Sequence, residues 1–150
     1  MNTSITVGQV LRAKGHVSYS IAPDATAYDA LELMANKNVG ALMVTENGNL
    51  VGVFSERDYA RKVILKGKAS KSTTVREIMS GSPISVKPVM TLQECMVLMT
   101  HKRIRHLPVL DNDVILGVIS IGDVVNAIIS EQESVIEELQ EYIAGTGYRA

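Results

Sequence analysis

The chain contains an internal repeat, in which one pattern of residues recurs 65 positions later without a gap. Aligning residues 20–58 with residues 85–123 compares 39 positions and gives 13 identities. In the first copy the identical positions are Ser20, Pro23, Thr26, Leu33, Met34, Lys37, Leu42, Val44, Asn47, Gly52, Val53, Ser55 and Asp58. One such unit cannot bury its apolar face alone and packs against its neighbour. Two copies therefore predict one compact body with approximate twofold symmetry.

Composition predicts one globular domain without an overall electrostatic field. The chain has 150 residues, 46% of them hydrophobic, with 15 Lys and Arg against 16 Asp and Glu. This length suits a single domain of roughly 100 to 200 residues, and the charge balance argues against a nucleic-acid or membrane partner. Cys95 is the only cysteine, which excludes an internal disulfide and suits a reducing compartment. With no leader segment and no apolar run of about 18 residues, we expect a soluble, cytoplasmic protein.

Hydrophobic periodicity predicts the order strand, helix, hairpin, helix in each copy. Residues 17–21 are β-branched, and helical spacing follows from Ala27 to Met34. Two apolar runs flank Asn47-Gly48, which is a strong hairpin signal. The remaining expected elements are strands 41–45 and 50–54 with a helix over 55–66 in the first copy, and strand 84–86, helix 91–101, strands 107–110 and 114–119 and a helix from residue 120 in the second. The predicted fold class is mixed α+β, with two β-α-β-β-α repeats related by a pseudo-twofold axis and an extended C-terminal helix.

A shorter echo precedes each copy, because residues 6–11 resemble residues 74–79. We therefore assign each lead-in helix to the repeat that follows it. Residues 67–73 are small and polar, which is typical of a linker. The predicted division is a first repeat over 5–66, a linker over 67–73, a second repeat over 74–130, and a C-terminal helical extension and tail over 131–150.

The end of each hairpin carries a Ser-x-x-Asp corner where a strand passes into a helix. At Ser55 to Asp58, free backbone N–H groups and the positive end of the helix dipole lie beside a carboxylate and a hydroxyl. Such a corner can hold a polar ligand, and a carboxylate there can accept hydrogen bonds from ribose hydroxyls. The alternative is a capping box in which Ser55 is the N-cap and Asp58 its partner, and Ser120 with Asp123 repeats the choice.

The order of elements and several segments resemble a tandem pair of CBS (cystathionine beta-synthase) domains, also called a Bateman module. The segments are Asn-Val-Gly-Ala-Leu-Met-Val and Arg-Ile-Arg-His-Leu-Pro-Val, with Gly-Val-Phe-Ser-Glu-Arg-Asp and Gly-Val-Ile-Ser-Ile-Gly-Asp closing the two copies. The likeness covers about residues 5–130. It implies an adenine-nucleotide sensor with two clefts related by the pseudo-twofold axis.

Each cleft implied by the resemblance combines a strand edge of one repeat with the Ser-x-x-Asp corner of the other. The expected members of the first cleft are Ser55, Arg57, Asp58, Ile84, Ser85, Ile104, Arg105, His106 and Pro108. The expected members of the second cleft are Tyr19, Ser20, Val39, Gly40, Ala41, Ser120, Gly122 and Asp123. Apolar side chains would enclose the adenine, and the aspartate would hold the ribose.

The two expected clefts differ in their supply of cations. Arg105 and His106 correspond to Gly40 and Ala41 in the other copy, so only the first cleft brings its own phosphate ligands. We expect AMP there, with ATP, ADP and NAD left open. Lys14 is an additional candidate cation in the second cleft, its alternative being a solvated surface charge.

Catalytic and metal chemistry are not expected. Cys95 aligns with Ala30 on the apolar stripe of a helix, where a small buried thiol is ordinary. The three histidines lack the short spacings of a metal cluster. We therefore expect neither an enzyme nor a metal site.

The C-terminal helix predicts an association surface. Between Ser120 and Ile143, apolar residues step by four and three along a helix of roughly 36 Å. An exposed stripe of this kind is better buried against another subunit, and folding back over the module is the alternative. The resemblance also implies dimers.

These observations together predict a stand-alone regulatory module, a homodimer that binds adenine nucleotides and signals to a separate effector protein. The alternatives are an interaction scaffold that binds no nucleotide, and a module for an S-adenosyl ligand or RNA.

Overall fold

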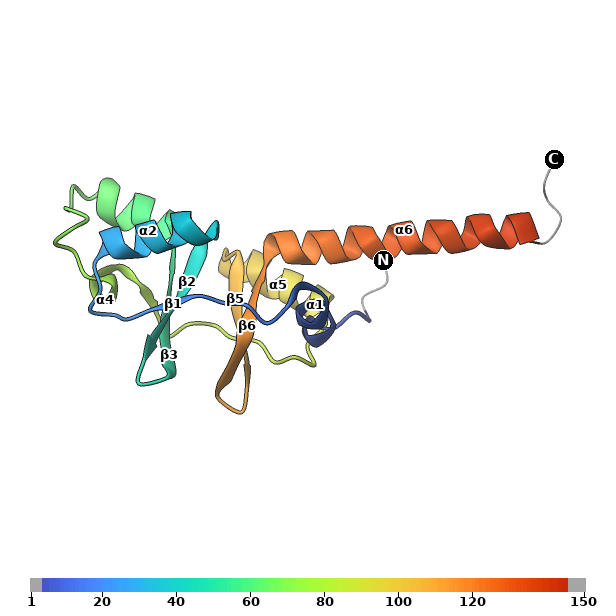
Figure 1. The fold of residues 1–150 in the computed structure, drawn as a ribbon, viewed down its shortest axis with the longest axis horizontal. Helices are drawn as coiled ribbons and strands as arrows, with labels where there is room; N and C mark the ends of the chain where they lie inside the picture. Colours follow the sequence, from blue (N-terminus) through green and yellow to red (C-terminus); the bar gives the residue numbers. More distant parts are fainter. Residues whose placement is uncertain (1–3, 146–150) are drawn as a thin grey trace.

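The computed structural model describes residues 4–145, and it has two similar halves side by side with one long helix that extends away from them (Figure 1). The first half follows the predicted order strand, helix, hairpin, helix. Its elements are β1 (Ser20–Ile21), α2 (Ala27–Lys37), β2 (Ala41–Glu46), β3 (Asn49–Ser55), α3 (Glu56–Tyr59) and the π-helical turn η1 (Ala60–Ile64). The second half contains α5 (Leu92–Lys102), β5 (His106–Asp111), β6 (Val114–Ser120) and α6 (Ile121–Gly145).

The two hairpins repeat each other down to the backbone register. Ala41 pairs with Ser55 at the base of β2 and β3, and His106 pairs with Ser120 at the equivalent place in β5 and β6. Both ladders shift register at the same repeat position, between residues 44 and 45 and between residues 109 and 110. The hairpin predicted at Asn47-Gly48 is confirmed, since both residues have positive φ angles of 53° and 80°.

The lead-in helices exchange between the halves. Helix α1 (Val7–Lys14) places Val7 and Leu11 in the apolar core of the second repeat, and α4 (Val75–Ile78) contributes to the core of the first repeat. Figure 1 shows α1 beside α5 and α4 beside α2. The sequence groups each lead-in with the repeat that follows it, but in space the lead-in completes the core of the other repeat.

Backbone hydrogen bonds fix this exchange on both sides. The amide of Val7 donates to Met90 O at 2.8 Å, and the amide of Leu92 donates to Ile5 O at 2.9 Å. In the other half the amide of Ala27 donates to Thr73 O at 2.8 Å, and the amide of Val75 donates to Ala25 O at 2.8 Å. Each bond satisfies a helix-start amide that has no partner within its own helix, so the chain between the repeats is bound at both ends.

Three predicted elements differ from the structure. The strand expected at 84–86 is a single bridge from Val86 to Val109, because Pro83 and Pro88 flank it and a proline has no N–H for a ladder. The strand expected at 17–21 is shortened to β1. The helix expected over 55–66 changes from α3 to the π-helical η1. A strand that was not predicted, β4 (Ser80–Gly81), pairs with Val53 and Gly52 at the edge of the first sheet.

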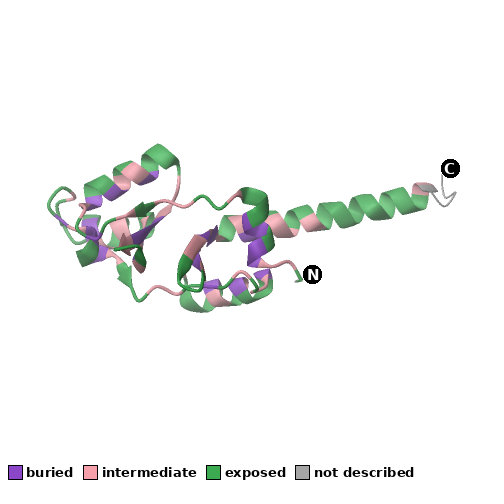
Figure 2. Cartoon of the chain, turned by 60° about the horizontal axis from the view of Figure 1, so that its bottom comes forward, coloured by how far each residue is buried: buried purple, intermediate pink, exposed green. Residues whose placement is uncertain are grey.

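Helix α6 is packed only along its first turns. Val124 is fully buried, and Ala127 and Ile128 pack against the second core. From residue 132 to residue 143 every side chain is exposed, and Figure 2 shows this part of the helix standing clear of the body. The alternative in which the helix folds back over its own module is not observed. None of the helices within residues 4–145 combines the length and the apolarity needed to cross a membrane.

The exchange of lead-in helices predicts which repeat each core mutation weakens. Leu11 and Ile78 are 0% and 1% exposed, and truncating a buried side chain of this size to alanine costs about 2–5 kcal/mol. We expect Leu11→Ala to lower hydrogen-exchange protection mainly in β5 and β6, and Ile78→Ala to lower it mainly in β2 and β3. Native-state hydrogen exchange measures both, and the opposite assignment would contradict the exchange.

Candidate functional site

A cavity of about 670 Å³ lies between the two repeats. It joins the Ser-x-x-Asp corner of the first repeat to the strand edge of the second. Of the residues predicted for the first cleft, those in the cavity wall are Ser55, Arg57, Asp58, Ile84, Ile104, Arg105 and His106. Gly40, which we assigned to the second cleft, lines this cavity as well. The structure therefore brings together most of one predicted set from segments far apart in sequence.

Ser85 and Pro108 were also predicted for this cleft but are not among its lining residues. Ser85 is exposed, and Pro108 is buried with its carbonyl oxygen accepting from the amide of Val86 at 2.9 Å. The sequence reasoning missed further lining residues, which are Val53, Glu56, Arg61, Lys62, Ser80, Gly81, Ser82, Pro83 and Arg103. Arg61 and Lys62 lie one helical turn beyond the corner, a spacing that could have indicated them.

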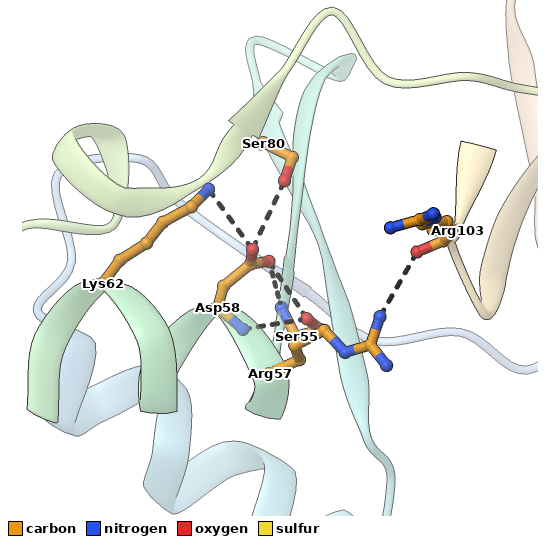
Figure 3. A network of polar contacts seen from close by, with 6 residues as sticks. All are labelled: Ser55, Arg57, Asp58, Lys62, Ser80 and Arg103. Atoms are coloured by element: carbon orange, nitrogen blue, oxygen red, sulfur yellow. Dashed lines mark hydrogen bonds and ion pairs between the residues drawn. The ribbon is translucent and has the colours of Figure 1, made fainter. Parts of the chain in front are cut away.

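Asp58 forms both the helix cap and part of the cavity wall (Figure 3). Its Oδ2 accepts from the amide of Ser55 at 2.9 Å and from Ser55 Oγ at 3.0 Å, while its own amide donates to Ser55 Oγ at 3.2 Å. Its Oδ1 lies 3.3 Å from Lys62 Nζ and 3.4 Å from Ser80 Oγ. The capping box is therefore present, and the second carboxylate oxygen faces the residues of the cavity.

Basic side chains outnumber acidic ones in the cavity wall. The basic residues are Arg57, Arg61, Lys62, Arg103 and Arg105, and the acidic residues are Glu56 and Asp58. Arg57 Nη1 donates to Arg103 O at 3.3 Å, a hydrogen bond that joins the two repeats across the opening (Figure 3). Guanidinium and ammonium groups in this number favour an anionic ligand, and phosphate oxygens suit the geometry of arginine.

Gly40 and His106 meet where the two repeats are closest. A Cβ atom at Gly40 would lie 3.2 Å from Glu56 Oε1 and 3.6 Å from His106 Nε2. Burial lowers the pKa of His106, and the charges of Lys14 and Arg105 lower it further, against Asp123 and Glu56, which raise it. The imidazole is therefore neutral at pH 7, so it can offer a hydrogen bond but not a positive charge.

Around Asp123, the predicted second cleft holds an internal ion pair. Lys14 Nζ lies 2.6 Å from Asp123 Oδ2 and donates to Val118 O at 3.0 Å. The same Oδ2 accepts from the amide of Ser120 at 2.8 Å, and Asp123 N donates to Ser120 Oγ at 3.1 Å, which completes the second capping box. Lys14 thus lies at the corner for which it was predicted, and it occupies the carboxylate that we expected to hold a ribose.

Burial raises the pKa of the Asp123 carboxyl, but hydrogen bonds from Lys14 and Ser120 outweigh it and leave that pKa below its ordinary value. The other predicted members of this cleft are spread over both repeats. Tyr19 and Val39 pack against the first core, Ser20 belongs to β1, Ala41 begins β2, and Gly122 lies exposed in the first turn of α6.

The same local motif has different surroundings at different helix starts. The described part of the chain contains capping boxes at Thr6, Thr26 and Thr91 as well as at Ser55 and Ser120. The hydrogen bonds of the cap are the same in kind at all five. At Ser55, however, the partner carboxylate turns its Oδ1 toward Ser80 and Lys62 within the cavity wall. Capping and ligand binding are therefore compatible at this corner, since each uses a different carboxylate oxygen.

Cys95 and the histidines show no catalytic or metal-binding arrangement. Cys95 is fully buried, and burial raises the pKa of its thiol to about 11, so it stays protonated and is no nucleophile at neutral pH. Within residues 4–145, His, Cys, Asp and Glu side chains form no cluster of three or more that could hold a metal ion.

A second hollow, of about 450 Å³, lies along the exposed side of α5. Its wall includes Met90, Val97, Leu98, His101 and Lys102, all on or beside one helix. It lacks a strand-to-helix corner and the convergence of cations from both repeats. The cavity between the repeats is therefore the better candidate site.

Comparison with known proteins finds the same domain type in each half. The family model of the CBS domain matches residues 15–65 and again residues 75–130. The mitochondrial CBS domain-containing protein CBSX3 of Arabidopsis thaliana is 41% identical over 154 residues, covering 97% of this chain and 74% of its own length. The mitochondrial location is that of the relative.

Two solved structures extend the comparison. A candidate signal-transduction protein with CBS domains from Burkholderia ambifaria MC40-6 is 46% identical, covers 85% of this chain and 96% of its own, and superposes with a TM-score of 0.82. A hexameric CBS-CP12 protein from bloom-forming cyanobacteria is 25% identical and superposes with a TM-score of 0.76. That match covers 99% of this chain and 92% of the other, so it includes α6.

The ion pair at the second corner predicts a specific loss of stability. Because the folded pKa of Asp123 is lowered, its contribution is present above the ordinary pKa of about 3.9 and is lost as the pH falls through the folded value. We expect Lys14→Met to lower the free energy of unfolding by about 1 kcal/mol at pH 7, with the difference from the unmodified protein disappearing below about pH 3. Chemical denaturation at several pH values measures this.

Lys62→Met is the matched control for that prediction, because Lys62 lies 3.3 Å from Asp58 and is more exposed than Lys14. We expect it to cost less at pH 7. An unchanged or larger difference between Lys14→Met and the unmodified protein at low pH would contradict the assignment of the ion pair.

Proposed function

Because the chain belongs to the CBS-domain family and is a paired regulatory module of that family, we propose that it senses adenine nucleotides through the cavity between its repeats. The carrying observation is the composition of that cavity. One carboxylate with an oxygen facing the cavity, that of Asp58, lies among five basic side chains contributed by both repeats. A volume of about 670 Å³ is in the range of small-molecule sites.

Each part of an adenine nucleotide has a matching group in the cavity wall. Ile84 and Ile104 supply apolar surface for the base. Asp58 Oδ1 accepts from the ribose hydroxyls, exchanging the longer contact with Ser80 Oγ for a shorter one. Arg57 and Arg105 hold the phosphates from opposite repeats. We propose AMP as the first ligand to test, with ATP, ADP and NAD as further candidates, since five cations can also neutralise a longer phosphate chain.

The phosphate-free alternatives fit the wall less well. An S-adenosyl compound carries a positive sulfonium, which the excess of arginine and lysine repels. RNA binding requires a broad basic surface, whereas this chain has nearly equal numbers of acidic and basic residues. An interaction scaffold without a ligand leaves the five converging cations unexplained.

Sensing requires that the ligand bind two states with different affinity. A coupling of about 1–3 kcal/mol gives a response of roughly 5- to 150-fold. The cavity wall comes from both repeats, so a bound nucleotide favours the arrangement that brings Arg57 and Arg105 together. We propose a homodimer in the cytoplasm that passes this change to a separate effector protein, and the hexameric assembly of the cyanobacterial CBS-CP12 protein supports self-association of this fold.

The first test is ligand-dependent thermal unfolding, followed by circular dichroism because the chain has no tryptophan. A ligand at 100 times its Kd stabilises the folded state by about 2.7 kcal/mol. We expect AMP to raise Tm by several degrees and Asp58→Asn to abolish that shift. S-adenosylmethionine, NAD, NADH, ADP and ATP complete the panel.

Asp29→Asn is the matched control, because Asp29 accepts from the amide of Thr26 at 3.3 Å in a capping box outside the cavity wall. Both variants lose a similar capping contribution, but only Asp58→Asn should lose the ligand shift. Equal ligand shifts in the two variants would leave Asp58 a cap only. The absence of any shift, in protein checked for carried-over ligand, would favour the scaffold.

A further prediction concerns the phosphate contacts. A hydrogen bond to a charged group contributes about 1.5–3 kcal/mol, so we expect Arg105→Gln to weaken AMP binding roughly 10- to 100-fold while adenosine binding changes little. Isothermal titration calorimetry measures both affinities. Lys102→Gln, an exposed site in the last turn of α5, is the control, and an equal loss for adenosine would contradict a phosphate role for Arg105.

A further inference from the structure

The outer part of α6 carries an apolar face that the body of the protein does not cover. Ile129, Ile136 and Leu139 are 47%, 54% and 58% exposed. Val135 and Tyr142 widen the same face and are also exposed. We call residues 125–143 of α6 the arm. Figures 1 and 2 show its outer half projecting away from both repeats, so an apolar surface of this extent needs a covering partner.

The spacing of the apolar residues fits a seam between two helices. Starting at Val125, the seam steps by four, three, four, three and four residues, and it runs through Val125, Ile129, Gln132, Ile136, Leu139 and Ile143. Isoleucine occupies every a position, and valine, glutamine and leucine occupy the d positions, which is a coiled-coil pattern. The acidic residues Glu137, Glu138 and Glu141 fall at b, c and f positions, away from this seam. A second helix can therefore pack on the seam without burying a charge.

The charges along the arm are strongly uneven. Residues 124–130 contain no charged side chain, whereas residues 131–141 contain five glutamates, and α6 contains no lysine or arginine. These glutamates lie toward the C-terminal end of the helix, where the helix dipole is already negative. Glu133, Glu137 and Glu141 also follow one another at i,i+4 spacing, which is unfavourable between like charges.

This distribution discriminates between the two directions of pairing. Two parallel arms would place all the glutamates of both chains and two negative helix ends side by side. Two antiparallel arms place the acidic half of each against the uncharged half of the other, and they also oppose the helix dipoles. In that direction the seam closes in register, because Ile129 meets Leu139 of the partner subunit and Ile136 meets Gln132 of the partner subunit.

We propose that the arm is a self-association surface whose partner is the arm of a second copy of this chain, packed antiparallel. This inference rests on the homodimer in the proposed function, but it does not depend on the ligand. The paired segment spans about 27 Å. The acidic outer face of each arm stays in solvent and repels nucleic acid and anionic membrane surfaces.

The molar mass in solution tests the surface. Light scattering on the full chain should give a dimer, and Ile136→Glu with Leu139→Glu should give a monomer that keeps its AMP-dependent Tm shift, because both residues are exposed outside the cores. Ser134→Glu, at an f position, should remain a dimer. A monomeric unmodified chain would overturn both the homodimer and the arm, and a dimer that survives the double substitution would overturn the arm alone.

Cysteine crosslinking tests the direction. Ile129→Cys and Leu139→Cys are made on separate chains, and the native Cys95 is buried, so the unmodified protein should not crosslink. Under mild oxidation we expect a disulfide only when the two variants are mixed, since position 129 meets position 139 of the partner subunit. Disulfides within each variant alone would show parallel arms and overturn the antiparallel pairing.

Discussion

The structure depends on the reciprocal exchange of the two lead-in segments. Val7 and Leu11 complete the core of the second repeat, and Val75 and Ile78 complete the core of the first. Neither repeat can bury its apolar face with residues of its own range alone. The exchanged backbone hydrogen bonds of 2.8 and 2.9 Å hold the crossing segments at both ends. The two halves therefore stay at a fixed distance, which is the condition for a cavity whose wall comes from both of them.

The sequence was sufficient for the repeated elements because their signals are local. Asn47-Gly48 and the 65-residue period predicted both hairpins, and the shared register shift shows how closely the copies agree. The exchange of α1 and α4 was missed, because the period shows that a lead-in belongs to each copy but not which core it enters. The strand at 84–86 was overpredicted because its β-branched residues were weighed without the flanking prolines.

The cavity was predicted only in part, for a related reason. Ser55, Asp58 and Arg105 belong to motifs that the copies or the family resemblance single out. Arg61, Lys62 and Arg103 were missed because a charged side chain on a helix face ordinarily points to solvent. Their convergence depends on the position of one repeat against the other, which is set by the lead-in exchange. Gly40 similarly joined the first cavity because it lies at the contact between the halves.

The two corners, alike in sequence, are made different by the lead-in that crosses to each. Helix α1 brings Lys14 to Asp123 at 2.6 Å, so the second carboxylate is neutralised within the protein. The first corner has Lys62 at the longer distance of 3.3 Å, from its own helix, together with cations that line an open cavity. A ligand hydroxyl at Asp123 must compete with an ion pair and its hydrogen bond to Val118 O, whereas one at Asp58 competes with a weaker contact to Ser80. The exchange that holds the repeats together thus also breaks the functional symmetry between them.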